Sequence, residues 1–233
     1  KRRICPPFSL FCTLTGSRGR GYNANRSMRP PRQRVRVRRE RMTDGMEEKK
    51  SFDVLTLGEI LLRLSPPDNE RLVRGDLLRK QTGGAELNVA SGIAMLGLRT
   101  GVISRIPDND IGYFVKNYIR FCSVSDDYLV YDRSADARLG VYYYENGAAP
   151  RKPAVIYDRH HSSMLGLTVD DLPADIYSQT RCFHTTGITL ALGEGVRSTA
   201  IEMIRRFKAA GAMISFDVNF RANLWNETQA RRY

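Results

Sequence analysis

The stretch QTGGAELNVASGIAMLG, residues 81–97, sets two adjacent glycines before a run of apolar residues at helical spacing. Leu87, Ala90 and Ala94 recur three or four residues apart, and TGVIS, residues 100–104, follows as a short apolar run typical of a strand. Glycines before a helix are a common way to cradle a phosphate, because no Cβ atom keeps the ligand from the backbone. The stretch predicts a turn, a helix and a strand, with a ligand near the turn.

The glycine pair does not fit the known phosphate loops. A dinucleotide-binding loop needs G-x-G-x-x-G directly after the first strand, and a P-loop needs G-x-x-x-x-G-K-[ST]; neither pattern occurs here. Glu86 at the predicted helix start would also repel a phosphate. Gly83 and Gly84 still permit a close ligand, and Asn88 offers a donor and an acceptor that suit hydroxyl groups. The alternative, in which the glycines only form the turn into a packed helix, stays open.

From Phe52 onward, apolar strands alternate with amphipathic helices. Strands are predicted near residues 52–59, 100–104, 181–187 and 212–219, the last two as buried strands, and helices at 85–97, 109–121 and 194–211, where Gly211 ends the helix. This alternation predicts an α/β fold with a parallel sheet flanked by helices.

Two segments, near residues 60–82 and 128–159, interrupt the alternation. Each has strand-like patterning and central turn residues, without a helix between its apolar runs. We expect hairpins that form a small β-sheet lid over the carboxyl ends of the core strands, where open α/β sheets bind their ligands.

The net charge of +12 lies almost entirely in residues 1–50, which include the arginine run RPPRQRVRVRRERM and which we expect to be disordered. Three interpretations compete for this extension: an arm that binds RNA or membranes, an organelle transit peptide, and upstream sequence that is not part of the native protein. We favour the third, because Met42 and Met46 stand just before the first predicted strand.

Composition excludes several classes of protein. Residues 51–233 are close to neutral, which argues against a nucleic-acid-binding body, and CPPFSLFCTL is too short for a membrane span. A nicotinamide dehydrogenase would need the missing glycine fingerprint. The four cysteines and three histidines lack paired ligand spacing, so we expect no metal site in the chain and a reduced, cytoplasmic setting.

Six motifs in order resemble the ribokinase-like, or PfkB, carbohydrate kinases, and most closely the 2-keto-3-deoxygluconate kinases. They are LTLGEILLRLSPP, GGAELNVASGIAMLGL, SRIPDNDIGYFV, LGVYYYENGAAPRKPAVIYDR, FHTTGITLAL and SFDVNFRANLW. The resemblance covers residues 52–233. It implies a Rossmann-type parallel sheet with a β lid, and ATP-dependent phosphorylation of 2-keto-3-deoxygluconate at its 6-hydroxyl with Mg²⁺ as the metal cofactor.

The resemblance also implies roles for single residues. Gly83 and Gly84 would form the floor of the sugar site with Asn88 beside them, and Tyr142 on a lid strand would contact the substrate through its hydroxyl. Arg159 would pair with the substrate's carboxylate, since a guanidinium can bond two oxygens at once. Apart from the resemblance, Arg159 reads as a solvated surface residue and Tyr142 as a packing residue. The segment with Asp217, Asn219 and Arg221 would lie near the transferred phosphate, and a turn role for Asp217 stays open.

Two departures from the family pattern qualify these expectations. Tyr144 stands where some relatives carry an arginine. The loss of this cation makes a neutral ketose, as in fructokinases, or another sugar acid more plausible, but 2-keto-3-deoxygluconate stays our first choice. The Gly-Ala-Gly-Asp stretch that supplies the catalytic base and anion hole does not occur in this chain. We therefore expect the base and most of the ATP and Mg²⁺ site beyond Tyr233, and an inactive truncation. A catalytically dead binding fragment is the alternative. The family also implies a homodimer through the lid strands.

Overall fold

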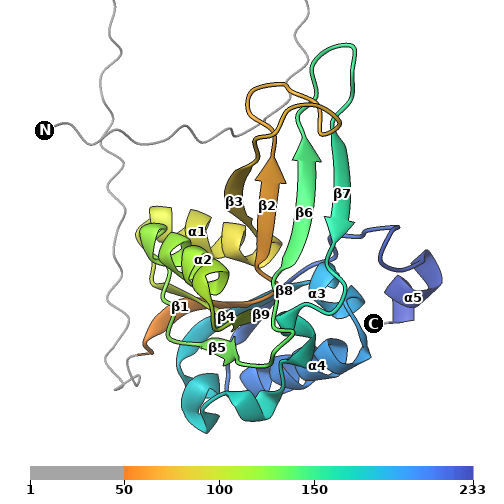
Figure 1. Ribbon diagram of the computed structural model, residues 1–233. Helices are drawn as coiled ribbons and strands as arrows, with labels where there is room; N and C mark the ends of the chain where they lie inside the picture. The colour runs from red at the N-terminus through yellow and green to blue at the C-terminus, as the bar shows by residue number, and fades with distance from the viewer. Residues whose placement is uncertain (1–49, 233) are drawn as a thin grey trace, which may run out of the picture. The chain divides into compact units, whose positions relative to one another are not determined.

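The computed structural model describes residues 50–232, so the basic extension of residues 1–50 lies outside the described residues except for Lys50. The larger of two sheets has five strands in the order β5-β4-β1-β8-β9, all parallel (Figure 1). The strands are β1 (Phe52–Leu57), β4 (Thr100–Pro107), β5 (Leu129–Asp132), β8 (Thr180–Thr186) and β9 (Met213–Asp217). The predicted α/β fold with a parallel sheet is confirmed.

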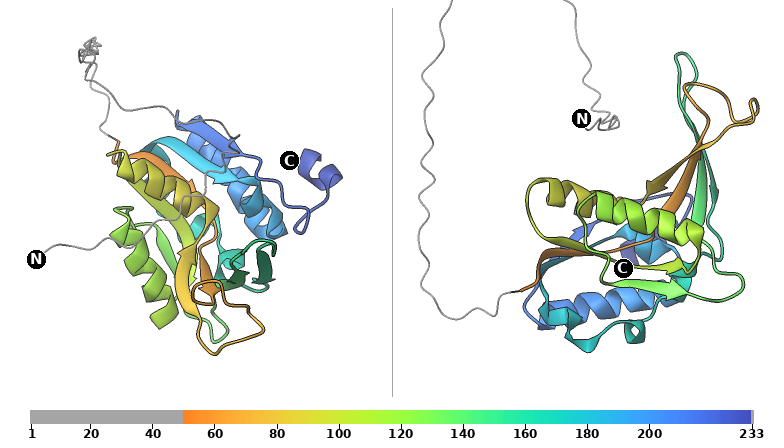
Figure 2. Two further views of the ribbon diagram at one scale, coloured as in Figure 1. Left: turned by 90° about the horizontal axis from the view of Figure 1, so that it is seen from above. Right: turned by 60° about the vertical axis from the view of Figure 1, so that its left-hand side comes forward.

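Helices cover both faces of this sheet (Figures 1 and 2). One apolar core lies under α1 (Ala85–Met95) and α2 (Asp110–Phe121), and a second lies under α4 (Glu194–Ala209) and the short 3-10 helices η1 (Ser163–Gly166), η2 (Val169–Asp171) and η3 (Ala174–Ser178). Two further helices, α3 (Gly187–Ala191) and α5 (Glu227–Arg232), follow β8 and β9. In the strand order of the large sheet β1 is central, and because β1 and β8 are parallel neighbours, their carboxyl ends adjoin.

The helix boundaries have local causes. The Asn109 side chain caps α2 by accepting hydrogen bonds from the backbone of Ile111 and Gly112, both at 3.1 Å. α4 buries residues three or four apart, and its chain turns at Gly211, whose φ of +82° favours glycine. The expected end of this helix is confirmed.

The smaller sheet contains β2 (Leu61–Ser65), β3 (Arg79–Gly83), β6 (Gly140–Glu145) and β7 (Ala154–Asp158), in the order β3-β2-β6-β7. Two antiparallel hairpins, β2–β3 and β6–β7, join through the parallel pair β2 and β6. This small sheet stands away from the helical layers (Figure 2). The predicted second sheet of paired hairpins is present.

We expected residues 128–159 to lie entirely in the lid, but the first strand of this segment, β5, does not. β5 pairs with β4 in the large sheet instead. Its Leu129 packs into the core under α1 and α2, while Val130 packs against the core on the opposite face. A strand covered on both faces belongs to a parallel sheet, but strand patterning alone does not assign a strand to one sheet or the other.

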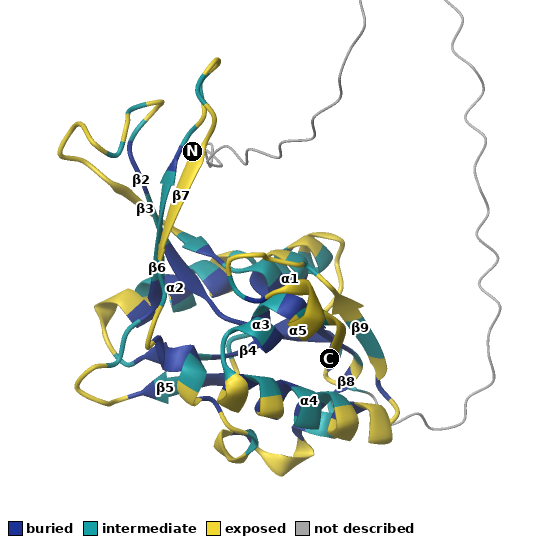
Figure 3. Cartoon of the chain, turned by 90° about the vertical axis from the view of Figure 1, so that its right-hand side faces the viewer, coloured by how far each residue is buried: buried dark blue, intermediate teal, exposed yellow. Residues whose placement is uncertain are grey.

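The expectation that β9 is buried is also wrong. Met213 is 68% exposed and Phe216 is 43% exposed, because β9 is an edge strand of the described sheet and pairs only with β8 (Figure 3). An apolar run in the sequence predicts a buried central strand, but it does not show whether a second strand covers the other edge.

Candidate functional site

A hollow of about 360 Å³ lies between one face of the small sheet and the carboxyl edge of the large sheet. Its walls come from the small sheet, from segments that follow β1, β7 and β9, and from the starts of α1 and α3: Glu59, Leu61, Arg63, Gly84, Ala85, Glu86, Asn88, Tyr142, Tyr144, Val155, Tyr157, Arg159, Ile188 and Arg221. Ligands of open α/β sheets bind outside the carboxyl ends of the strands. This hollow is therefore the candidate site.

The small sheet presents alternate residues of three strands to the hollow. In its register Arg63 lies opposite Tyr142, and Tyr142 lies opposite Tyr157, with their ring centroids 5.8 Å apart. Burial raises the pKa of the Tyr142 hydroxyl, and the nearby Arg63 charge opposes this shift. Tyr142 therefore lines the hollow as a neutral phenol at neutral pH.

The glycine pair forms the join between the two sheets. Gly84 has a φ of +151°, and a Cβ atom there would lie 2.9 Å from the Glu59 carbonyl oxygen. A Cβ atom on Gly83 would lie 2.7 Å from the Tyr142 hydroxyl oxygen. Of the three residues predicted for the floor of the site, Gly84 and the exposed Asn88 line the hollow directly, and Gly83 does not. Packing within the protein thus already requires both glycines, and Gly83 makes room for Tyr142.

Glu86 turns into the protein instead of standing as an exposed charge at the start of α1. It is 2% exposed, and its Oε1 atom accepts hydrogen bonds from the hydroxyls of Thr186 at 2.8 Å and Thr189 at 2.7 Å. Burial raises the pKa of Glu86, and these hydrogen bonds only partly oppose the shift. The expected repulsion of a phosphate by Glu86 is therefore weaker than the sequence indicates. Glu86 instead joins α1 to the start of α3.

We predict that Glu86→Gln flattens the pH dependence of stability. The native pKa of Glu86 lies above its ordinary value of 4.5, so the native state keeps a proton that the unfolded chain releases. The contribution of Glu86 is fully present below pH 4.5 and is lost as the pH rises through the native pKa. Glutamine does not titrate. Urea unfolding from about pH 4 to pH 8 should show a smaller decline for the variant, and equal declines would contradict a buried neutral Glu86.

Arg159 lines the hollow, but a carboxylate of the protein already neutralises its charge. Its Nη2 atom donates a short hydrogen bond to Glu59, two residues after the end of β1, and the Ser162 hydroxyl donates to the other Glu59 oxygen at 2.5 Å. The side chains of Glu59 and Arg159 are 3% and 12% exposed. Arg159 is thus not a solvated surface residue, and it connects the end of β7 to the end of β1. Its binding of a substrate carboxylate stays a prediction.

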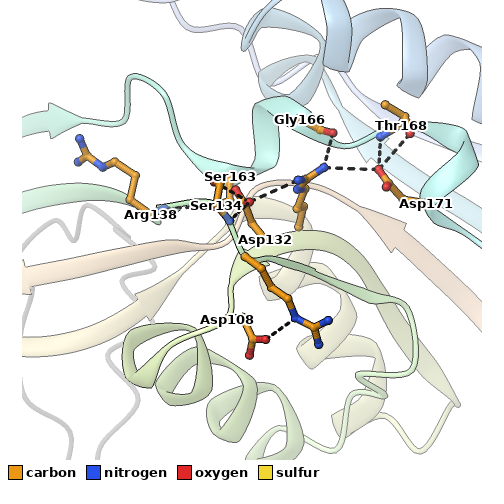
Figure 4. A network of polar contacts seen from close by, with 10 residues as sticks. Asp108, Asp132, Ser134, Arg138, Ser163, Gly166, Thr168 and Asp171 are labelled. Carbon is orange, nitrogen blue, oxygen red and sulfur yellow. Dashed lines mark hydrogen bonds and ion pairs between the residues drawn. The ribbon is translucent and has the colours of Figure 1, made fainter. Parts of the chain in front are cut away.

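A polar network holds the chain that follows Arg159 (Figure 4). The backbone amide of Arg138, just before β6, donates to the Ser163 hydroxyl at 3.1 Å, and the Arg105 guanidinium bonds the Gly166 carbonyl at 2.7 Å. Burial raises the pKa of Asp132, but hydrogen bonds from Ser134 and Ser163 and the Arg105 charge outweigh it and lower the pKa to about 2. This network anchors the base of the small sheet near Glu59.

Two further arginines reach the hollow. Arg63 on β2 lies over the Tyr144 ring, with its Cζ atom 4.2 Å from the ring centroid, and donates to the Ser65 hydroxyl at 3.0 Å. Arg221 comes from the segment after β9 and donates to the Phe220 carbonyl at 3.0 Å. Neither arginine has an ion-pair partner within residues 50–232. The cation that Tyr144 does not supply is therefore present on the neighbouring strand.

Residues 51–233 match the pfkB family of carbohydrate kinases over their whole length. The chain belongs to this family. It is 39% identical over 179 residues to a 2-dehydro-3-deoxygalactonokinase of Haloferax volcanii, covering 77% of this chain and 55% of the relative. It is 28% identical over 184 residues to a 5-dehydro-2-deoxygluconokinase of Shouchella clausii, covering 78% and 56%.

Solved structures of pfkB-type kinases share the fold. The 2-dehydro-3-deoxygluconokinase of Thermotoga maritima superimposes with a TM-score of 0.73 and 35% identity, over 78% of this chain and 55% of that one. The present pfkB-family chain thus spans about half the length of the relatives that it matches.

Only one of the three residues expected near the transferred phosphate enters the hollow of this pfkB-family chain. Arg221 lines it, whereas Asp217 and Asn219 do not. The Asp217 carboxylate accepts a hydrogen bond from the Asn219 backbone at 2.9 Å, and Asn219 has a φ of +37°. This is the turn role left open for Asp217. A position near the phosphate stays a prediction for both residues.

Glu59 and Arg63 are the site residues that sequence reasoning missed. Each had a signal in the sequence: Glu59 lies two residues after the end of the first parallel strand, and Arg63 is two residues from Leu61 and so shares its face of β2. Within residues 50–232 no cluster of three metal-ligating side chains is found, and no helix there combines the length and apolarity of a membrane span.

Proposed function

We propose that this chain provides the sugar site of an ATP-dependent kinase for a sugar acid. Our first choice of substrate is 2-keto-3-deoxygluconate, also called 2-dehydro-3-deoxygluconate, phosphorylated at its 6-hydroxyl. Gly84, Asn88 and Tyr142 would contact the sugar, with Gly83 beneath Tyr142. The alternatives are a neutral sugar, as in a fructokinase, and a binding fragment without activity.

The charge balance of the hollow carries this proposal. Arg63, Arg159 and Arg221 line it, and Glu59 balances Arg159 alone. Burial raises the pKa of Glu86, which favours its neutral form. Closing a pocket over unpaired cations is costly unless the ligand supplies an anion. A carboxylate on the sugar meets this requirement and a neutral ketose does not. Three of the relatives are a 2-dehydro-3-deoxygalactonokinase, a 5-dehydro-2-deoxygluconokinase and a 2-dehydro-3-deoxygluconokinase, and their names support the same choice.

ATP would supply the phosphoryl group, as the family implies. The described residues do not fit a complete ATP and Mg²⁺ site: the Gly-Ala-Gly-Asp stretch that the family resemblance implies does not occur among them, and residues 50–232 contain no cluster of three metal ligands. We derive no step of the transfer from this chain. Its residues would bind the sugar, and the small sheet would exclude water from the hollow.

Calorimetric titration of the 233-residue chain tests the proposal. We expect 2-keto-3-deoxygluconate to bind at least about tenfold more tightly than fructose, a difference of about 1.4 kcal/mol. Equal affinities would contradict a sugar-acid site, and tighter binding of fructose would favour the fructokinase alternative. ADP release from ATP and Mg²⁺ in the presence of the sugar acid tests phosphoryl transfer by the same chain. Binding without release would favour the binding fragment.

The homodimer through the lid strands remains part of the proposal. β3 and β7 are the two edges of the small sheet, and most of β7 is exposed (Figure 3). An exposed strand edge can pair with a second copy of the chain. Sedimentation equilibrium would show a mass of twice 26.4 kDa for such a dimer, and a monomer at all concentrations would contradict it.

A further inference from the structure

We propose that Arg63 is the residue that selects an acid over a neutral sugar, by binding the substrate carboxylate from above the Tyr144 ring. This inference rests on the proposed sugar-acid site. It assigns the discrimination to a residue on β2, and not to the lid position of Tyr144 or to Arg159.

The first argument is that Arg63 is held in place. Its guanidinium lies 4.2 Å from the centroid of the Tyr144 ring, and its Nε atom donates to the Ser65 hydroxyl at 3.0 Å. Stacking and this hydrogen bond engage one face and one donor of the group. The guanidinium also interacts with the Tyr142 hydroxyl, but no carboxylate within residues 50–232 pairs with it, and Arg63 lines the hollow. A cation fixed in this way loses little side-chain entropy when it binds a carboxylate.

The second argument is the difference between Arg63 and the other two arginines. Arg159 is engaged by the buried Glu59, so a substrate carboxylate would compete with a carboxylate of the protein. Arg221 is exposed and follows a turn, where water screens its charge. Arg63 is half-buried and has no carboxylate partner among the described residues. It therefore has the largest electrostatic gain from an anionic ligand.

The third argument concerns the placement of Tyr144. Arg63 and Tyr144 project from the adjacent strands β2 and β6 onto the same face of the small sheet. A cation anchored on either strand reaches the same part of the hollow. Tyr144 serves here as the platform on which the cation from β2 rests.

A pair of ligands that differ in charge tests the inference. The affinities of 2-keto-3-deoxygluconate and of its methyl ester are measured by calorimetry for the full chain and for Arg63→Met. We expect the variant to bind the acid about tenfold to a hundredfold more weakly, which is typical of a lost charged hydrogen bond, and to bind the ester as the unaltered chain does. The same ligand pair is used throughout, so the size of the methyl group cancels.

Two further variants separate charge from structure. Arg74→Met removes an arginine that lines a different hollow, next to Leu77 and Leu78, and should leave both affinities unchanged. The double variant Arg63→Met/Tyr144→Arg returns a cation from β6 and should restore most of the preference for the acid. Loss of the preference in the single variant without recovery in the double variant would contradict a role for charge here. Thermal melts confirm that each variant is folded.

The outcomes distinguish this inference from the proposed function. If the unaltered chain does not prefer the acid to its ester, the proposed sugar-acid site is wrong. If the unaltered chain prefers the acid and Arg63→Met keeps that preference, the site stands and the assignment to Arg63 is overturned.

Discussion

Replacement of Glu59 by alanine is expected to lower the free energy of unfolding by about 3–5 kcal/mol. The change removes the partner of the Arg159 guanidinium, whose side chain is only 12% exposed, and leaves its charge in the protein without compensation. It also removes the acceptor of the Ser162 hydroxyl. Urea unfolding followed by circular dichroism measures the loss, and we expect weaker binding of the sugar acid because Arg159 lines the same hollow.

The double variant Glu59→Ala/Arg159→Met is the control for this prediction. It removes both charges, so it should be more stable than Glu59→Ala alone. Arg133→Ala breaks an ion pair with Asp108 in which the arginine side chain is 81% exposed, and it should change stability little. A Glu59→Ala chain as stable as the Arg133→Ala chain would show that the Glu59–Arg159 pair does not hold the small sheet to β1.

Replacement of Gly187 by alanine is expected to destabilise the chain by about 3 kcal/mol, the upper part of the range for overpacked sites. A Cβ atom there would lie 2.1 Å from the Val218 carbonyl oxygen and 3.3 Å from the Trp225 ring. Backbone cannot move aside as a flexible side chain can, so the segment that carries Arg221 must shift. We expect a lower melting temperature together with weaker binding of the sugar acid.

Gly92→Ala is the matched control, since it makes the same change at a helical glycine with open space around the added carbon. It should raise the free energy of unfolding by about 0.5–1 kcal/mol, because alanine restricts the unfolded chain and favours a helix. Comparable losses in the two variants would mean that close approach to Val218 is not the cause.

Five of the eight predicted site residues line the hollow. Gly84, Asn88, Tyr142, Arg159 and Arg221 all reach the hollow, although they come from separate parts of the chain. The motifs that carry the family resemblance are enough to bring them together, because they follow the strands and helices that line the carboxyl edge of the sheet. The partners of these residues could not be predicted in the same way.

The amino-acid sequence alone determined the local elements, the two-sheet α/β architecture and the family. Strand and helix spacing depends on which neighbouring residues are apolar, and this pattern is written along the chain. Only the tertiary structure decided that Arg159 is paired with Glu59, that Glu86 is buried against Thr186, and that Arg63 rests on Tyr144. The first two contacts join residues 100 positions apart. The positive charge available to a ligand depends on such distant pairings, because a carboxylate beside an arginine neutralises its charge. The sequence shows the arginine but not its partner.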